Sequence, residues 1–251
     1  MFNFKVDKKL KRWKNCDIIS NMKNIFTKYG FNLTEKQLSQ FEKYYNLLID
    51  FNAKFNLTAI TEKEEVYIKH FVDSIMAVKM LNCGKLIDVG SGGGFPAIPI
   101  KIMCENLSVT MLEATGKKCE FLKTVAKELG LEKVEVINGR AEEFAFKENF
   151  REKFDYCTAR AVARLNILSE YCLPFVKKGG KFVALKGDAK EELLEGLSAI
   201  KILGGKLIKE NEFTLEGAKR NIIEIEKIAL TDKKYPRSNG KIRKNALWTK
   251  F

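Results

Sequence analysis

The amino-acid sequence predicts an α/β fold with a mostly parallel sheet of seven strands, an antiparallel edge hairpin and a helical N-terminal extension. Three observations predict it. Over residues 22–82, apolar side chains recur every three or four positions, as on one face of a helix. From residue 85 onward, short apolar runs alternate with amphipathic segments, which is typical of parallel strands joined by helical crossovers. The last two apolar runs are only four residues apart, and so short a connection allows only antiparallel pairing.

The helical region is expected over residues 22–82. Thr34 and Gln37 stand three positions apart, as in a capping box, and predict the start of a helix. The large apolar side chains that follow share one helical stripe, namely Leu38, Phe41, Tyr45, Leu48, Phe51 and Phe55. A second helix is expected over residues 62–80. Its apolar stripe consists of Val66, Phe71, Ile75 and Val78. Both stripes are expected to form core.

The strands of the sheet are expected at the short apolar runs. The parallel strands are KLIDV (85–89), LSVTMLE (107–113), KVEVIN (133–138), FDYCTA (154–159) and KFVALK (181–186). Helices are expected between them, near 97–104, 116–129, 163–175 and 189–203. The edge hairpin pairs residues 205–215 with 220–230. The chain thus divides into a basic N-terminal extension (1–21), the helical region (22–82), the sheet domain (83–231) and a basic C-terminal tail (232–251).

The formal net charge of +13 is concentrated at the two ends of the chain. Residues 1–21 hold six basic against two acidic residues, and residues 232–251 hold seven against one. Basic ends suit a polyanion such as nucleic acid, although solvated tails have the same composition. No apolar run is long enough for a membrane span or a secretory signal, so a cytoplasmic protein is expected. The six scattered cysteines and the single histidine predict no metal site.

The first strand of the sheet ends in a turn with four glycines in five positions. Without side chains, such a turn lets a ligand lie against the backbone. Residues Asp88–Gly94 follow the pattern D-x-G-x-G-x-G of S-adenosylmethionine-binding methyltransferases, with Gly90 and Gly92 inside it. The Asp88 carboxylate suits the ammonium group of that cofactor. A dinucleotide fingerprint would need glycine where this chain has Phe95, and the P-loop G-K-[ST] is absent. The alternative is a plain structural turn.

Two further positions support a Rossmann-like, S-adenosylmethionine-dependent methyltransferase fold. Glu113 closes the second strand, where a carboxylate can accept hydrogen bonds from both ribose hydroxyls. Ala141 and Glu142 follow the third strand, where the geometry of this fold puts the adenine ring. The structural alternatives are an exposed helix-capping acid and the first turn of a short helix.

Seven separated blocks resemble one family in order along the chain. They are FNLTAI (55–60), KHFVDSI (69–75), LIDVGSGGGFPAIPIKI (86–102), EATGKKCEFL (113–122), GRAEEF (139–144), TARAVARL (158–165) and ALKG (184–187). Over about Met22 to Lys227, the sequence resembles the ribosomal RNA small subunit methyltransferase G family, also called glucose-inhibited division protein B. The resemblance implies transfer of a methyl group from S-adenosylmethionine to N7 of guanine 527 in 16S rRNA, with the rRNA or the small ribosomal subunit as partner.

The resemblance also implies roles for individual residues. Cofactor contacts would fall on Asp88, Gly90, Gly92, Phe95, Glu113, Ala114, Thr115, Ala141, Glu142 and Arg160. Asn56, Arg140 and Arg160 would act around the reacting base. RNA contacts would fall on Lys117, Lys186, Arg237 and Arg243, the last two in a tail whose KYPRSNGKIRKNAL resembles a basic motif of many members.

Guanine N7 has an in-plane lone pair and no proton, so it needs no general base, and alignment can supply most of the catalysis. Methylation of cytosine C5 needs a cysteine nucleophile, and no Pro-Cys motif surrounds Cys157. An adenine-N6 enzyme would carry an Asn/Asp-Pro-Pro turn where this chain has residues 158–160. His70 and Asp73 form an i, i+3 pair that suggests acid–base work, but a structural or docking role is favoured.

Two other classes stay open at this point. One is a non-catalytic RNA-binding protein that retains the fold, against which the intact motif residues argue. The other is a small-molecule methyltransferase, which would not explain two basic ends. The N-terminal extension precedes the resemblance, so Met22 is an alternative start. A monomer without membrane or metal partners is expected.

Overall fold

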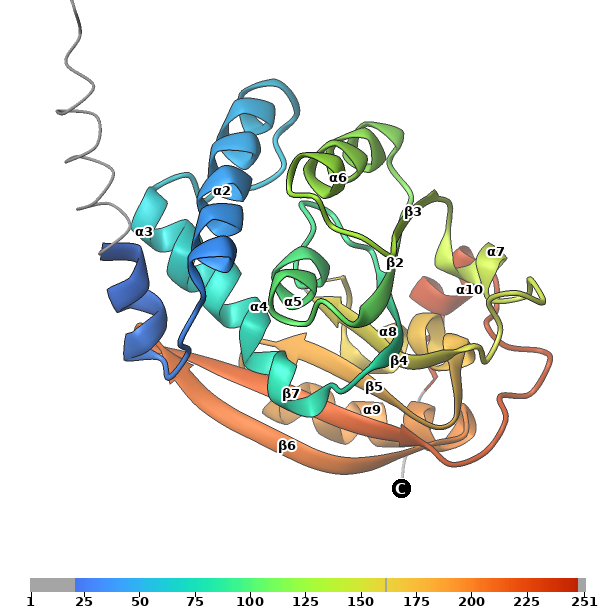
Figure 1. Ribbon diagram of the computed structural model, residues 1–251. Coiled ribbons are helices and arrows are strands. Elements are labelled where there is room, and N and C mark those ends of the chain that lie inside the picture. The colour runs from blue at the N-terminus through green and yellow to red at the C-terminus, as the bar shows by residue number, and fades with distance from the viewer. Residues whose placement is uncertain (1–20, 161, 248–251) are drawn as a thin grey trace, which may run out of the picture.

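The computed structural model describes residues 21–160 and 162–247 (Figure 1). It contains one seven-stranded sheet in the order β3-β2-β1-β4-β5-β7-β6. The strands are β1 Gly84–Val89, β2 Leu107–Glu113, β3 Val134–Asn138, β4 Phe154–Arg160, β5 Val176–Lys186, β6 Gly205–Leu215 and β7 Ala218–Lys227. The first five are parallel, and β7 runs antiparallel to both β5 and β6. The predicted sheet and its edge hairpin are confirmed. The predicted basic extension lies outside the described residues except for Asn21.

The strand order reverses between β1 and β4, which pair side by side. The chain builds β2 and β3 on one side of β1 and returns to build β4 and β5 on the other. The carboxyl ends of β1 and β4 therefore border the crevice in which open α/β sheets bind ligands. Asp88 of β1 and Thr158 of β4 are register partners at this end. The topology thus places the glycine turn at the expected ligand site.

Helices cover both faces of the sheet (Figure 1). Successive strand residues alternate between the two faces, so Leu86 and Met111 join one core cluster while Ile87 and Leu112 join the other. The first cluster includes side chains of three helices, α2 Glu35–Phe55, α5 Ala97–Met103 and α6 Gly116–Glu128. The second includes side chains of α8 Leu165–Cys172 and α9 Lys190–Ile202.

The N-terminal helical region matches the prediction at its first helix and differs at its second. The capping box of Thr34 and Gln37 is present. Tyr44 rather than Tyr45 is the fully buried tyrosine of α2. The second helix, expected to be continuous, changes geometry along its length. Its parts are α3 Lys63–Val66, the π-helix η1 Tyr67–Val72, α4 Asp73–Ile75 and the 3₁₀-helix η2 Met76–Met80. The wider π-turns alter the stripe and carry His70.

Three short elements complete the fold, two of them near the carboxyl ends of the strands and one, a 3₁₀-helix, directly before β5. They are α7 Ala141–Phe144, the 3₁₀-helix η3 Leu173–Phe175 and α10 Asn239–Lys244. In Figure 1, α10 (red) lies beside α7, so the chain after β7 returns to the domain. Ile242 of α10 is completely buried. Within the described residues, no helix has both the length and the apolar character needed to cross a bilayer.

Candidate active site

The glycine turn between β1 and α5 needs its glycines for two different reasons. Gly90, Gly92 and Gly94 have φ values of +74°, +56° and +91°, in the left-handed region that favours glycine. A Cβ atom on Gly90 would lie 2.9 Å from Val162, and one on Gly94 would lie 2.4 Å from Ile98. A Cβ on Gly92 would meet nothing closer than 3.8 Å. Gly92 is therefore required by its backbone conformation and faces open space.

Asp88 is almost completely buried at the end of β1, with 1% of its surface exposed. Its Oδ1 accepts a hydrogen bond of 2.8 Å from the Thr158 hydroxyl. Its Oδ2 is buried without a hydrogen-bond partner among the described residues. Burial raises the pKa of Asp88 to about 6, although the neighbouring Ser91 and Thr158 side chains and the charge of Arg160 oppose the rise. An unpaired buried carboxylate oxygen is costly, so this site fits a cationic donor such as the ammonium group of S-adenosylmethionine.

Glu113, at the end of β2, connects the glycine turn to the start of α6. One carboxylate oxygen accepts from the Gly92 amide and the other from the Thr115 amide, both at 2.9 Å. Each oxygen retains acceptor capacity, because a carboxylate offers about four lone-pair sites. The geometry therefore leaves Glu113 able to accept from ribose hydroxyls while it fixes the turn.

A cavity of about 130 Å³ lies between the ends of the first three strands. It is lined by Val89, Gly90, Leu112, Ala114, Gly139, Arg140, Ala141, Glu142, Val162, Tyr171, Asn239 and Arg243. Four of the expected cofactor residues meet here, and we call it the cofactor cavity. Sequence reasoning missed Tyr171 and Asn239 because they come from α8 and α10, far away in the chain.

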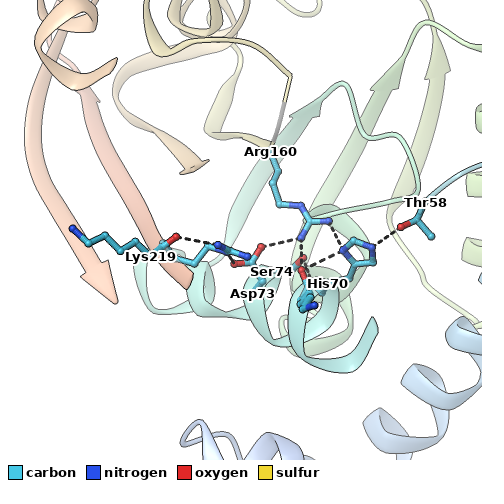
Figure 2. A network of polar contacts seen from close by, with 8 residues as sticks. Thr58, His70, Asp73, Ser74, Arg160 and Lys219 are labelled. Carbon is cyan, nitrogen blue, oxygen red and sulfur yellow. Dashed lines mark hydrogen bonds and ion pairs between the residues drawn. The ribbon is translucent and has the colours of Figure 1, made fainter. Parts of the chain in front are cut away.

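Arg160 and Phe95, also expected at the cofactor, meet around His70. The Phe95 ring stacks on the imidazole at a centroid distance of 4.5 Å, and the Arg160 guanidinium lies 4.9 Å from the Phe95 centroid. Arg160 donates to Asp73 at 2.9 Å and its other terminal nitrogen lies 3.2 Å from His70 Nδ1 (Figure 2). Asp73 also accepts from Arg220 at 3.2 Å. The network joins the helical region to β4 and β7.

His70 is not hydrogen-bonded to Asp73, its partner in the sequence pattern, and both side chains instead contact Arg160. His70 Nδ1 lies 3.2 Å from the Arg160 guanidinium, which can only donate, and 3.2 Å from the Lys69 carbonyl, which can only accept. Nε2 lies 2.8 Å from Thr58 Oγ1. Burial, followed by the charge of Arg160, lowers the pKa of His70 from 6.5 to about 3. The imidazole is neutral at physiological pH.

A second cavity, of about 330 Å³, lies against this network. Its lining residues are Ile60, Lys69, His70, Asp73, Arg160, Leu185, Lys186, Gly187, Glu192 and Arg220. Lys186 is nearly buried, with its ammonium 2.6 Å from Glu192 and donating to the Ala163 carbonyl. It lines this cavity, which we call the polar cavity. Val162 lines the cofactor cavity and Arg160 the polar one, so the two flank the turn after β4.

The remaining predicted residues are three exposed side chains, Asn56, Lys117 and Arg140, and two residues of the tail. Asn56 ends α2 in the left-handed conformation, and Lys117 lies 5.3 Å from the centroid of the neighbouring Phe55 ring. Arg140 is exposed, 3.9 Å from Glu142. Arg237, expected to contact RNA phosphates, is instead paired with the fully buried Glu170, because a buried carboxylate requires a cationic donor. Arg243, expected in the same role, lines the cofactor cavity.

The doubly wound sheet, its glycine turn and the acidic ends of β1 and β2 define a Rossmann-like methyltransferase fold. Solved structures of low sequence identity share it. Geranyl diphosphate methyltransferase in complex with GPP and sinefungin matches with a TM-score of 0.52 and 12% identity. TYW2 from M. jannaschii in complex with AdoMet matches with a TM-score of 0.50 and 17% identity. Each match covers 62% of this chain and 77% of the other.

Sequence comparison gives the family. The family model for rRNA small subunit methyltransferase G (GidB) matches residues 37–223. Proteins named ribosomal RNA small subunit methyltransferase G from Lactobacillus johnsonii and Exiguobacterium sibiricum are 50% and 51% identical to the chain. The matches cover 88% and 87% of this chain and 95% and 94% of the relatives. The chain belongs to the rRNA small subunit methyltransferase G family, which confirms the resemblance seen in its motifs.

Proposed function

We propose that the protein methylates N7 of guanine 527 in 16S rRNA, with S-adenosylmethionine as the methyl donor. The observation that carries the proposal is the buried, unpaired carboxylate oxygen of Asp88 at the switch point of the sheet. A protein that only bound RNA would gain nothing from this costly group. The names of the relatives, which describe a methyltransferase of small-subunit ribosomal RNA, support the substrate class.

The chain supplies a complete set of groups for the cofactor. Asp88 would hold the ammonium group, Glu113 the ribose hydroxyls, and the cofactor cavity between Gly90 and Glu142 the adenine. When bound, S-adenosylmethionine supplies a methyl group on a positively charged sulfur. The role of these residues is to bind and orient the cofactor, and the hydrogen bond from the Gly92 amide ties the glycine turn to Glu113.

The polar cavity fits the target base. Its cationic side chains, including Arg160, Lys186 and Arg220, can donate to the O6 acceptor of guanine. Glu192 can accept from the amino group that distinguishes guanine. Because the two cavities flank the turn after β4, Arg160 belongs to the wall between the base and the cofactor.

The proposed chemistry requires no proton transfer before the methyl transfer. Guanine N7 is an acceptor with a free lone pair. The pKa of about 3 makes His70 a poor general base at neutral pH, since an efficient base has a pKa near the working pH. His70 positions Arg160 and Phe95 instead.

RNA would approach over the part of the surface where Asn56, Lys117 and Arg140 are exposed. We infer that the protein acts in the cytoplasm, where the ribosomal subunit is assembled. We also infer that it acts as a monomer, because one chain lines both cavities.

Tritium transfer from S-adenosylmethionine labelled on its methyl group tests the function. The purified protein is incubated with 16S rRNA, with small ribosomal subunits and, as a control, with 23S rRNA. We expect label in at least one small-subunit substrate, none in 23S rRNA, and a large loss of labelling with Asp88→Asn. A protein that binds the cofactor and both small-subunit substrates but transfers no label would instead be a non-catalytic RNA-binding protein.

A further inference from the structure

The basic segment that follows β7 is fixed to the domain by hydrogen bonds and by one buried apolar side chain. The guanidinium of Arg151 donates to the carbonyls of Thr231, Asp232 and Tyr235 at 2.8, 3.2 and 3.0 Å. Ile242 of α10 is completely buried in the core cluster that contains α8. The described part of the tail is therefore a docked element rather than a solvated end.

A second set of contacts connects this segment to α8. Glu170 has a fully buried side chain and accepts from the backbone amide of Arg237 at 2.7 Å, and from its Nε and Nη2 at 2.9 and 2.7 Å. The next residue of α8, Tyr171, donates to Asn239 Oδ1 at 2.6 Å. Two consecutive residues of α8 thus determine where α10 begins.

α10 reaches the cofactor cavity with two side chains. Asn239 and Arg243 both line it, together with Tyr171. They are four positions apart, so they project from the same side of the helix. The Arg243 guanidinium lies close enough to Tyr171 to oppose the rise that burial causes in the pKa of that hydroxyl. Ala141 and Glu142 also line this cavity.

We propose that α10 forms part of the adenine-binding wall of the cofactor cavity, with Asn239 and Arg243 as cofactor-positioning residues; this rests on the proposed use of S-adenosylmethionine. The side chains match an adenine ring in hydrogen-bonding character. Oδ1 of Asn239 is occupied by Tyr171, so its amide nitrogen remains to donate to a ring nitrogen. Arg243 can donate to the ring or lie on its face. Glu142 can accept from the exocyclic amino group.

The basic residues of α10 have different positions. Arg243 and Lys244 are both exposed, but only Arg243 lines the cofactor cavity. Substituting either residue by Gln removes one positive charge at nearly the same place in the chain. Lys244→Gln is therefore a matched control for Arg243→Gln.

Titration calorimetry in the absence of RNA tests the inference with two ligands, S-adenosylmethionine and 5′-methylthioadenosine, which lacks the amino-acid part. We expect Arg243→Gln to raise the dissociation constant of both ligands about tenfold, as loss of one charge-assisted hydrogen bond does. Asn239→Ala should also weaken both, and Lys244→Gln should leave both unchanged. If Lys244 contacts an RNA phosphate, Lys244→Gln should reduce the slope of log RNA affinity against log salt concentration by about 0.7–0.9.

Wild-type affinity for both ligands in Arg243→Gln and Asn239→Ala proteins of unchanged melting temperature would overturn the inference. Equal weakening by Lys244→Gln would also overturn it, since the effect would then follow net charge. A loss confined to S-adenosylmethionine would place Arg243 at the amino-acid end and contradict the adenine assignment. If the wild-type protein bound neither ligand, both the proposed function and the assignment of α10 would be contradicted.

Discussion

Arg160 donates a hydrogen bond of 3.2 Å to Nδ1 of His70, the only histidine of the chain. A guanidinium has only donors and a positive charge, so this contact favours a neutral imidazole. The ring also stacks on Phe95 of the glycine turn. One neutral histidine thus connects the helical region, β4 and the proposed cofactor site.

His70 should affect the rate through position and not through proton transfer. We expect His70→Gln to lose less than the ~10²–10⁴-fold that removal of a general base costs. Near pH 6.5, the single-turnover rates of the wild-type protein and the variant should depend on pH in the same way. A loss of that size, with such a limb disappearing in a folded variant, would contradict the positioning role.

Acid should act on stability with opposite signs through His70 and Asp88. In the unfolded chain the His70 imidazole binds a proton near pH 6.5, but in the folded protein it stays neutral down to about pH 3. Acid therefore destabilises the fold through His70. Folded Asp88 binds a proton near pH 6, and the unfolded carboxyl only near 3.8, so acid stabilises the fold through Asp88 in that window.

Between about pH 6 and 4, His70→Gln should therefore lose less unfolding free energy than the wild type, and Asp88→Asn should lose more. Each slope should change by at most about 1.4 kcal/mol per pH unit. Denaturant titrations at several pH values measure both slopes. Two variants with the wild-type slope would contradict the assigned protonation states.

Binding of S-adenosylmethionine should weaken below about pH 6. The ligand's ammonium favours the ionised form of Asp88, whose pKa is about 6 in the free protein. The dissociation constant should rise by up to about tenfold per pH unit below that value. Asp88→Asn should bind weakly with little dependence on pH in calorimetric titrations. If the wild-type dissociation constant did not change from pH 7 to 5, the assignment of Asp88 to the ammonium group would be contradicted.

Gly92→Val should abolish cofactor binding because its side chain would enter the open space at the glycine turn. Its φ of +56° also strains any branched residue, by about 1–2 kcal/mol. Gly130 provides a matched control, since it has a φ of +61° and open space around it, after α6. We expect Gly130→Val to show similar destabilisation but normal calorimetric affinity. Equal affinity of both folded variants would contradict the assignment of the turn.

Much of the fold could be predicted because its signals are local. The apolar runs of the strands, the capping box at Thr34 and the glycines after β1 all lie within a few residues of the feature that they specify. Parallel pairing and the position of the ligand crevice then follow from topology.

The polar contacts of the site could not be predicted in the same way, because they join distant segments. Arg160 and Asp73 are 87 residues apart, and Arg237 and Glu170 are 67 apart. No periodicity pairs such residues, so neither the charge nor the motif of the basic tail predicts that it docks against α8. The π-helical turns at Tyr67–Val72 were missed because regular spacing continues through them.

Mapping of N7-methylguanine at nucleotide resolution is the most direct test of methylation at guanine 527. 16S rRNA treated with the wild-type protein and S-adenosylmethionine is reduced with borohydride and cleaved with aniline at methylated guanines. We expect one new cleavage site, at guanine 527, which is absent from RNA treated with the Asp88→Asn protein. Efficient methyl transfer with no cleavage at that guanine, or with the methyl group on a different atom, would contradict it.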